Sequence, residues 1–186
     1  ATTFTPNATT SRGMIVAILW RQAGSPTVDY LMEFNDVAPT AYYGEAVRWA
    51  ASEGIVGGYG DGRFGPNDII TRQQLAAILY RFAQQQGCVH LPADGRAVDK
   101  HQLVALVVVD ESRSGIDIQG RSADDQHLAS DADLGAVSSY AVEALQWANA
   151  EGLVNGTSAT TLSPGGNATR AQAAVILSRF CQSIAQ

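Results

Sequence analysis

The chain has 186 residues, of which 46% are hydrophobic and 16% are charged, and its formal net charge is −6. This composition excludes a disordered chain, and the acidic balance argues against nucleic-acid binding, which needs a basic face. The most apolar stretch, residues 102–109, is far shorter than the roughly 20 residues of a membrane-spanning helix. We therefore expect a globular protein with no membrane span and no nucleic-acid partner.

One motif occurs three times in chain order. The sequence Phe-Thr-Pro-Asn at residues 4–7 recurs as Phe-Gly-Pro-Asn at residues 64–67 and as Leu-Ser-Pro at residues 162–164. A hydroxyl–arginine pair follows each time, at residues 11–12, 71–72 and 169–170, and opens an apolar run with helical spacing. Such recurrence is the signature of a repeat architecture, so a functional residue should occur in every copy.

The first copy, residues 1–27, is predicted to hold only the loop tail and the second helix of a repeat, from Ser11 to about Ala23. Its first helix is absent from the sequence. Because Phe4 matches the middle of the second copy, we expect the chain to be a fragment or a processed product.

The second copy, residues 28–87, is complete. Its first helix is predicted over residues 42–53, where Ala46, Val47 and Ala50 recur at helical spacing, and Gly54 is placed to end it. A turn-rich loop follows at residues 57–66. The second helix then begins after Thr71, with Gln74 as half of a capping box.

Residues 88–127 are predicted to be an insert, because the repeat shifts of 60 and 98 residues differ by 38. Segments 102–109 and 115–119 could pair as a small β-hairpin, and the remainder is expected to be irregular. The third copy, residues 128–186, repeats the plan of the second. We expect all four segments to form one compact domain.

The insert region also holds the residues that most often bind metals. His90, His101 and His127 lie in or beside it, but their spacing matches no compact ligand motif, so we expect solvated histidines and no metal site. Cys88 and Cys181 could form a disulfide or remain thiols.

Arg12, Arg72 and Arg170 are predicted at the first position of their helices. A cation there is disfavoured by roughly 0.3–1 kcal/mol because the helix N-terminus is partly positive. Three aligned cases call for a compensating partner. One candidate is a ligand carboxylate or phosphate, held jointly by the guanidinium and the helix-start N–H groups. The other is an internal bridge to an acidic side chain of a neighbouring copy, such as Asp36 or Asp61, and both hold if the ligand lies between copies.

Two aromatic pairs align between the complete copies, Tyr42 with Tyr140 and Trp49 with Trp147. An aromatic ring beside a polar loop suits stacking on the C–H face of a sugar. Rings at helical spacing more often pack in a core, so both roles stay open at this point.

The repeat resembles the S-layer homology domain family over all of the chain outside the insert. The residues that carry the resemblance are Phe34, Asp36, Val37, Tyr42, Glu45, Ala46, Val47, Gly54, Ile55, Val56, Gly58, Tyr59, Asp61, Gly62, Phe64, Pro66, Ile70, Thr71 and Arg72. The resemblance implies a mainly α fold, a pseudo-threefold prism of helix–loop–helix repeats. It also implies an extracellular protein of the bacterial cell surface that binds a secondary cell-wall polysaccharide, often one carrying ketal-linked pyruvate.

The resemblance places the ligand in grooves between repeats, beside the start of the second helices. It therefore implies binding by the three aligned arginines, with Gly57, Gly58 and Gly156 as backbone that a ligand approaches closely. Glycines at these positions also suit a simple turn after a helix.

We predict a non-catalytic module that anchors a larger protein to an acidic wall glycan and uses no cofactor. The alternative is a self-assembly or protein-partner-binding module that uses the insert as its contact surface. Its partners would then be other surface-layer proteins. Glycan hydrolysis would require two carboxylates flanking a cleft. Of the candidate carboxylates, only Asp36 and Asp61 lie in loops, and no Ser–His or Cys–His pairing stands out, so we expect no enzyme.

Overall fold

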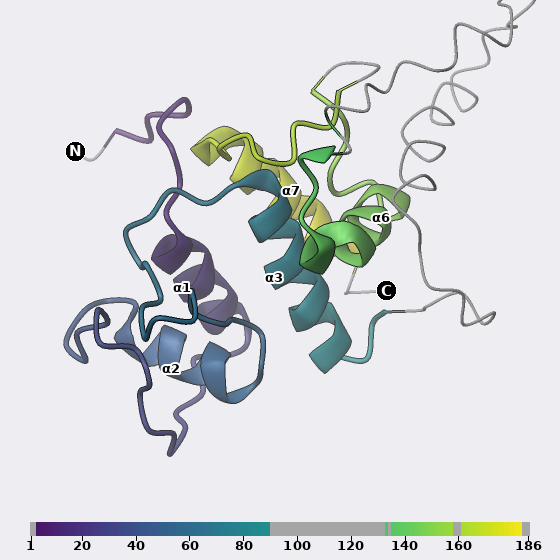
Figure 1. Ribbon diagram of the computed structural model, residues 1–186. Coiled ribbons are helices and arrows are strands. Elements are labelled where there is room, and N and C mark those ends of the chain that lie inside the picture. The colour runs from purple at the N-terminus through teal and green to yellow at the C-terminus, as the bar shows by residue number, and fades with distance from the viewer. Residues whose placement is uncertain (1–2, 90–132, 134, 158–160, 184–186) are drawn as a thin grey trace, which may run out of the picture. The chain divides into compact units, whose positions relative to one another are not determined.

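The computed structural model describes residues 3–89, 133, 135–157 and 161–183. Its helices are α1 (Arg12–Gln22), α2 (Gly44–Ser52), α3 (Arg72–Gln85), α6 (Val142–Ala150) and α7 (Arg170–Ser183), with the short 3₁₀-helix η3 (Ser139–Ala141) before α6 (Figure 1). Within these ranges, β-type pairing takes the form of isolated bridges, among them Thr9 with Thr169 and Ser11 with Ile69. The predicted mainly α class is confirmed, and the threefold prism stays a prediction.

The chain divides into two compact units whose boundaries do not follow the repeats. The first unit comprises residues 1–70, 81–89 and 167–175, and the second comprises residues 71–80, 90–166 and 176–186. The repeat boundaries and the single compact domain expected from the sequence therefore stay predictions. The hairpin predicted at residues 102–119 and the three histidines lie outside the described residues. Cys88 and Cys181 are thiols, half-buried and exposed respectively.

Reciprocal side-chain caps start the second helices of the complete copies. In α3, Thr71 Oγ1 accepts from the Gln74 amide (3.3 Å), and Gln74 Oε1 accepts from the Thr71 amide (3.0 Å). Thr169 and Gln172 make the same two bonds at the start of α7 (3.2 and 3.1 Å). The capping box predicted for the second copy is confirmed, and the third copy repeats it.

Glycines end the first helices by a shared arrangement. Gly54 takes a left-handed backbone (φ +68°) and donates to the Ala51 carbonyl (3.1 Å), while Ile55 donates to Ala50 (2.8 Å). Gly152 (φ +66°) ends α6 with the equivalent pair of bonds. These are the two bonds of a Schellman motif, which satisfies the last carbonyls of a helix and favours glycine at this position.

Three aligned backbone positions form a closed cycle of hydrogen bonds inside the first unit. Thr10 donates to the Ala168 carbonyl (3.1 Å), Ala168 donates to Ile70 (3.0 Å), and Ile70 donates to Thr10 (2.9 Å). Each residue lies two positions before a helix-start arginine. All three side chains are buried, with at most 4% of their area exposed. The cycle therefore satisfies three buried amides and joins the three copies just ahead of their second helices.

Each second helix also receives backbone caps from the loop of another copy. The first amide of α1 donates to Asp68, that of α3 to Gly166, and that of α7 to Ala8, at 2.8–3.0 Å. The second amides donate to the aligned prolines Pro66, Pro164 and Pro6, at 2.9–3.0 Å. An isolated helix leaves these amides without partners. The repeated loop therefore serves as a cap for its neighbour.

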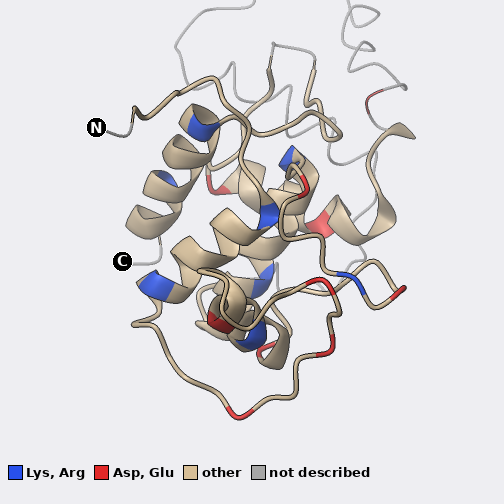
Figure 2. Cartoon of the chain, turned by 90° about the vertical axis from the view of Figure 1, so that its left-hand side faces the viewer, with Lys and Arg blue, Asp and Glu red and all other residues tan. Residues whose placement is uncertain are grey.

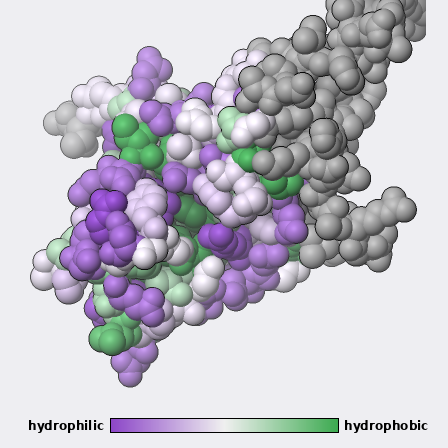
Figure 3. All heavy atoms as spheres, in the orientation of Figure 1, coloured by the Kyte–Doolittle hydropathy of each residue, from purple (hydrophilic) through white to green (hydrophobic). Residues whose placement is uncertain are grey.

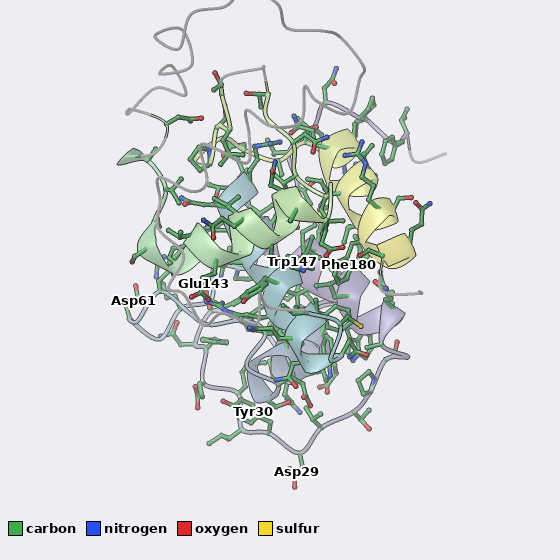
Figure 4. All side chains as sticks on the ribbon, turned by 90° about the vertical axis from the view of Figure 1, so that its right-hand side faces the viewer. Asp29, Tyr30, Asp61, Glu143, Trp147 and Phe180 are labelled. Carbon is green, nitrogen blue, oxygen red and sulfur yellow. The ribbon has the colours of Figure 1, made fainter. Side chains whose placement is uncertain are left out.

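The core of each unit is built from the first helix of a copy packed against second helices. In the first unit, α2 packs beside α1, and its Trp49 ring lies 5.9 Å from the Phe82 ring of α3. In the second unit, the Trp147 ring of α6 lies 5.6 Å from Tyr80 of α3 and 6.2 Å from Phe180 of α7 (Figure 4). Burial of these rings stabilises the fold because aromatic side chains remove large apolar areas from water.

One face of the described chain is mostly polar. On the face drawn in Figure 3, hydrophilic residues predominate and apolar residues form separate patches. No helix in the described part of the chain has both the length and the apolar character that crossing a bilayer requires.

The first copy lacks half of its capping box, which gives a stability prediction. Ser11 Oγ accepts from the Met14 amide (3.4 Å), but methionine has no group to return the bond. Met14→Gln should raise the free energy of unfolding by roughly 0.3–1.5 kcal/mol, because it supplies the acceptor that Gln74 provides in α3. The matched swap Gln74→Met should lower it by a similar amount. Urea unfolding followed by circular dichroism measures both, and equal stabilities for all three proteins would contradict the assignment.

Candidate functional site

Arg12 joins the start of α1 to the loop of the second copy, within the first unit. Its Nε donates to the Phe64 carbonyl and its Nη2 to the Gly57 carbonyl, both at 3.0 Å. The guanidinium carbon also lies 5.0 Å from the centre of the Tyr59 ring and 4.7 Å from that of Phe64. Only 7% of Arg12 is exposed. Cation–π contacts are strongest where the cation is desolvated, so the two rings help to offset the cost of burying this charge.

Arg72 repeats the arrangement in the second unit. Its Nε donates to the Leu162 carbonyl (3.1 Å) and its Nη2 to the Asn155 carbonyl. These acceptors align with Phe64 and Gly57. Burial lowers the pKa of the Arg72 guanidinium, and the charge of Asp133 partly opposes this change. The group stays a cation at neutral pH because the ordinary pKa of arginine is so high.

Arg170 completes the set at the start of α7, within the first unit. Its Nη1 donates to the Phe4 carbonyl (3.2 Å) and to Thr5 Oγ1 (3.0 Å). Phe4 is the first-copy equivalent of Phe64 and Leu162. Arg170 is half-buried, more open to solvent than the other two arginines. Each aligned arginine therefore bonds to the same loop position of a different copy.

This arrangement corrects one expectation about the helix starts. We expected the helix-start N–H groups to hold an anion together with the guanidinium. That expectation is wrong for the first two amides of each helix, because loop carbonyls already accept from them at 2.8–3.0 Å. Any anion bound here must therefore rely on the side chains.

The acidic residues proposed as internal partners organise the loops. Asp36 accepts from the Phe64 and Gly65 amides (both 2.8 Å). Asp133 does the same in the third copy, where it accepts from the Leu162 and Ser163 amides. Asp133 is offset by one residue from the shift of 98 that relates Phe64 to Leu162, so the constant spacing of the copies does not pair it with Asp36.

Asp61 has a different partner from the one expected. Its Oδ2 accepts from Arg63 Nε at 2.8 Å, and both side chains are about half exposed. The pair lowers the pKa of Asp61, mainly through that hydrogen bond. Arg63 also lies 5.7 Å from the Tyr59 ring, which the sequence analysis did not single out. Tyr59 is 45% exposed and lies beside two arginines, so it belongs with the candidate site.

The other aromatic candidates divide by exposure. Trp49 is 5% exposed and packs in the core, and Trp147 is half-buried against two rings. Tyr42 and Tyr140, in contrast, are 56% and 52% exposed. The tryptophans therefore follow the packing alternative, and the tyrosines present rings that a ligand could reach.

The candidate glycines differ in the space around them. A Cβ added at Gly57 would meet nothing within 4 Å, so its face is open. At Gly58 a Cβ would lie 2.6 Å from the Arg63 carbonyl and 2.7 Å from the Phe34 ring. Gly156 is half-buried. Close packing inside the loop therefore explains Gly58, while Gly57 keeps an accessible backbone.

Basic and acidic positions are distributed along several helices and loops of the described chain (Figure 2). In those same ranges, no group of three His, Cys, Asp or Glu side chains could hold a metal ion. The groups that this candidate site offers to a ligand are therefore guanidinium groups, tyrosine rings and the accessible backbone at Gly57.

Comparison with known proteins supplies the family. Residues 33–76 and 131–174 match the model of the S-layer homology domain. The chain is 28% identical over 177 residues to an amylopullulanase of Thermoanaerobacterium thermosulfurigenes, covering 95% of this chain and 8% of that protein. It is 42% identical over 55 residues to the outer membrane protein SlpA of Thermus thermophilus, covering 30% and 6%. It is 30% identical over 61 residues to a cellulosome-anchoring protein of Acetivibrio thermocellus, covering 33% and 14%.

The chain thus spans a small part of each of these three relatives, between 6% and 14% of their length. No solved structure matches it. The two matched segments contain Arg72, Arg170 and the loops that Arg12 and Arg72 bind, whereas Arg12 itself and the Phe4 loop lie outside them. Two segments of the chain, residues 33–76 and 131–174, therefore belong to the S-layer homology domain family.

Proposed function

We propose that these 186 residues form a non-catalytic module that anchors a larger polypeptide to the bacterial cell surface. Membership of the S-layer homology family supports this, and so do the names of two relatives, an outer membrane protein and a cellulosome-anchoring protein. The two relatives named as enzymes, an amylopullulanase and an endoglucanase, share only 8% and 16% of their length with this chain. Their catalysis therefore fits the remainder of those proteins.

The ligand in this proposal is an acidic cell-wall polysaccharide, such as one carrying pyruvate ketals. The single observation that carries it is the aligned arginine set, fixed in each copy by bonds to carbonyl oxygens. A carbonyl bond positions a guanidinium without cancelling its charge. With five N–H donors, a guanidinium can hold a carbonyl on one edge and receive a carboxylate on another.

Exposed groups beside Arg12 supply the rest of the proposed glycan surface. The Tyr59 ring, 45% exposed, offers an apolar face for a pyranose, and the open backbone of Gly57 lets the sugar approach. Tyr42 and Tyr140 are further exposed rings that could stack on sugars. In this scheme Asp36 holds the loop amides, Trp49 and Trp147 pack against helix rings, and none of the three touches the ligand.

Arg170 gives the sharpest test of anion recognition, because it is the most accessible of the aligned arginines. Arg170→Gln should weaken sedimentation with purified cell walls by about tenfold or more, since a charge-assisted bond contributes roughly 1.5–3 kcal/mol. The matched control is Arg179→Gln, an exposed arginine of the same helix that bonds to the Gly152 carbonyl. It removes the same charge and should bind as the unmodified chain does.

Removing pyruvate from the walls should weaken the unmodified chain at least as much as Arg170→Gln does, because all three aligned arginines then lose their carboxylates. Equal losses for the two variants would instead indicate a diffuse charge effect. Binding that ignores both pyruvate and Arg170 would contradict the carboxylate proposal. Binding that needs wall protein instead would favour a protein partner. Release of reducing sugar from wall polysaccharide would overturn the non-catalytic assignment.

Substitutions at two neighbouring glycines should have different effects, one on ligand binding and the other on stability. Gly57→Ala should weaken wall binding while leaving the free energy of unfolding unchanged or raised by about 0.4–1 kcal/mol, because its new methyl group points into open space. Gly58→Ala should lower the melting temperature, because its methyl group would meet a carbonyl and a ring. Thermal melting by circular dichroism and wall sedimentation together check both. Full binding by a correctly folded Gly57→Ala variant would remove Gly57 from the site.

A further inference from the structure

The dipeptide Asn155-Gly156 lies in the loop that Arg72 binds, and no other Asn-Gly pair occurs in the 186-residue sequence. Asn155 is exposed and Gly156 is half-buried. Among the described residues, neither the side-chain amide of Asn155 nor the backbone N–H of Gly156 has a hydrogen-bond partner. Glycine also has no side chain to crowd the amide before it. The side chain of Asn155 and the amide of Gly156 are therefore free to react with each other.

The reaction open to this pair is the loss of ammonia from asparagine. The backbone N–H of Gly156 gives up its proton, and its nitrogen attacks Cγ of Asn155. The bond from Cγ to the side-chain nitrogen breaks, ammonia leaves, and a cyclic succinimide remains. Water then opens the ring at either carbonyl carbon. Attack at Cγ gives aspartate, whereas attack at the former backbone carbonyl carbon gives isoaspartate.

Arg72 contacts the oxygen on which the first step depends. Its Nη2 donates to the backbone carbonyl of Asn155, and its Nε donates to that of Leu162 at 3.1 Å. When the N–H of Gly156 loses its proton, negative charge moves onto this Asn155 oxygen, because the peptide group is delocalised. A guanidinium hydrogen bond to an anionic oxygen is stronger than one to a neutral carbonyl. The contact therefore favours ring closure.

The same hydrogen bond directs the opening of the ring. A guanidinium polarises the carbonyl that it binds and stabilises the oxyanion that forms when water attacks there. The bound carbonyl is the former backbone carbonyl of Asn155, so attack at this carbon leaves its free carboxylate on Arg72. Only 6% of Arg72 is exposed, and a charge interaction is stronger where little water screens it. Isoaspartate is therefore the favoured product.

We propose that Asn155 is a site of spontaneous deamidation, and that Arg72 promotes the reaction and directs it to isoaspartate. Water is the only co-reactant and ammonia the only product released. The hydrogen bond from Arg72 becomes an ion pair at the same oxygen. The aligned contact in the second copy lacks the reactive group, because Arg12 Nη2 donates to the carbonyl of Gly57 at 3.0 Å and glycine has no side-chain amide.

Incubation of the folded chain at mildly alkaline pH tests the proposal. Peptide mass spectrometry measures the loss of ammonia at Asn155, and enzymatic methylation of isoaspartate measures that product. A synthetic peptide of residues 153–157 gives the ratio of isoaspartate to aspartate in the absence of Arg72. The folded chain should exceed this ratio by about tenfold, the effect of one charge-assisted hydrogen bond. An equal ratio, or no isoaspartate in the folded chain while the peptide converts, would overturn the proposal.

Substitution of the arginine separates its charge from the fold. Arg72→Gln should slow ammonia loss about tenfold and lower the product ratio to that of the peptide. The matched control Arg63→Gln removes an exposed arginine that pairs with Asp61 and should change neither quantity. An Arg72→Gln variant that keeps the high product ratio would overturn the proposal. If this variant fails to fold by circular dichroism, the comparison of the folded chain with the peptide still decides.

The second copy allows the reaction to be introduced elsewhere. Gly57→Asn places an asparagine before Gly58 with its backbone carbonyl on Arg12, and its side chain would enter open space. New isoaspartate should form at position 57, again with a product ratio about tenfold above that of a peptide with the same sequence. Arg12→Gln in this background should lower the ratio to that of the peptide. A peptide-like ratio with Arg12 present would contradict the role given to the guanidinium.

The new carboxylate also affects the anchoring role, and this consequence rests on the proposed function. An ion pair with isoaspartate occupies the Arg72 guanidinium that a wall carboxylate would need. Chain incubated to full conversion should therefore sediment with cell walls about tenfold more weakly than fresh chain. The variant Asn155→Gln should lose nothing on the same incubation. Full binding by the converted chain would contradict this consequence alone, because isoaspartate formation is measured without walls.

Discussion

Hydrogen bonds between the starts of the second helices and the loops of other copies are the interaction on which the rest of the structure depends. A helix start leaves amides without partners, and here two of them in each second helix find carbonyls of a neighbouring loop. The loops can supply these carbonyls because a left-handed residue, Thr5, Gly65 or Ser163, bends the chain at the same point in every copy. Without these hydrogen bonds, the helix-start amides and the loop carbonyls would both lose their partners.

The arginine at each helix start follows from the same exchange. Its position costs free energy against the helix dipole, but its side chain donates to a loop carbonyl, and for Arg12 and Arg72 this hydrogen bond is buried. The residue thus contributes to folding whether or not a ligand is present. In the proposed anchoring role, a carboxylate would meet guanidinium groups that are already fixed, so little conformational freedom would be lost on binding.

The exposed fraction of each candidate side chain, rather than its residue type, shows whether a ligand could reach it. The aligned tryptophans are candidates for sugar stacking in the sequence, yet they pack against other rings, and Asp36 and Asp133 bind loop amides. Tyr59 and Gly57 present open faces next to a fixed cation. The copies also differ in burial, since Ile18 of α1 and Val175 of α7 are exposed although the aligned residues of the other copies are buried.

Local chemistry allowed the sequence alone to determine the helices, their caps and the family. Thr71 with Gln74, and Gly54 after α2, act through contacts a few residues apart, so the pattern was sufficient to place them. Only the tertiary structure decided where Arg12 and Arg72 direct their side chains, because their acceptors lie 45 to 90 residues away. It likewise decided that Trp49 is buried and that Tyr59 is exposed. The surroundings of a side chain come from segments that are distant in the sequence, and local periodicity does not predict which of these segments meet.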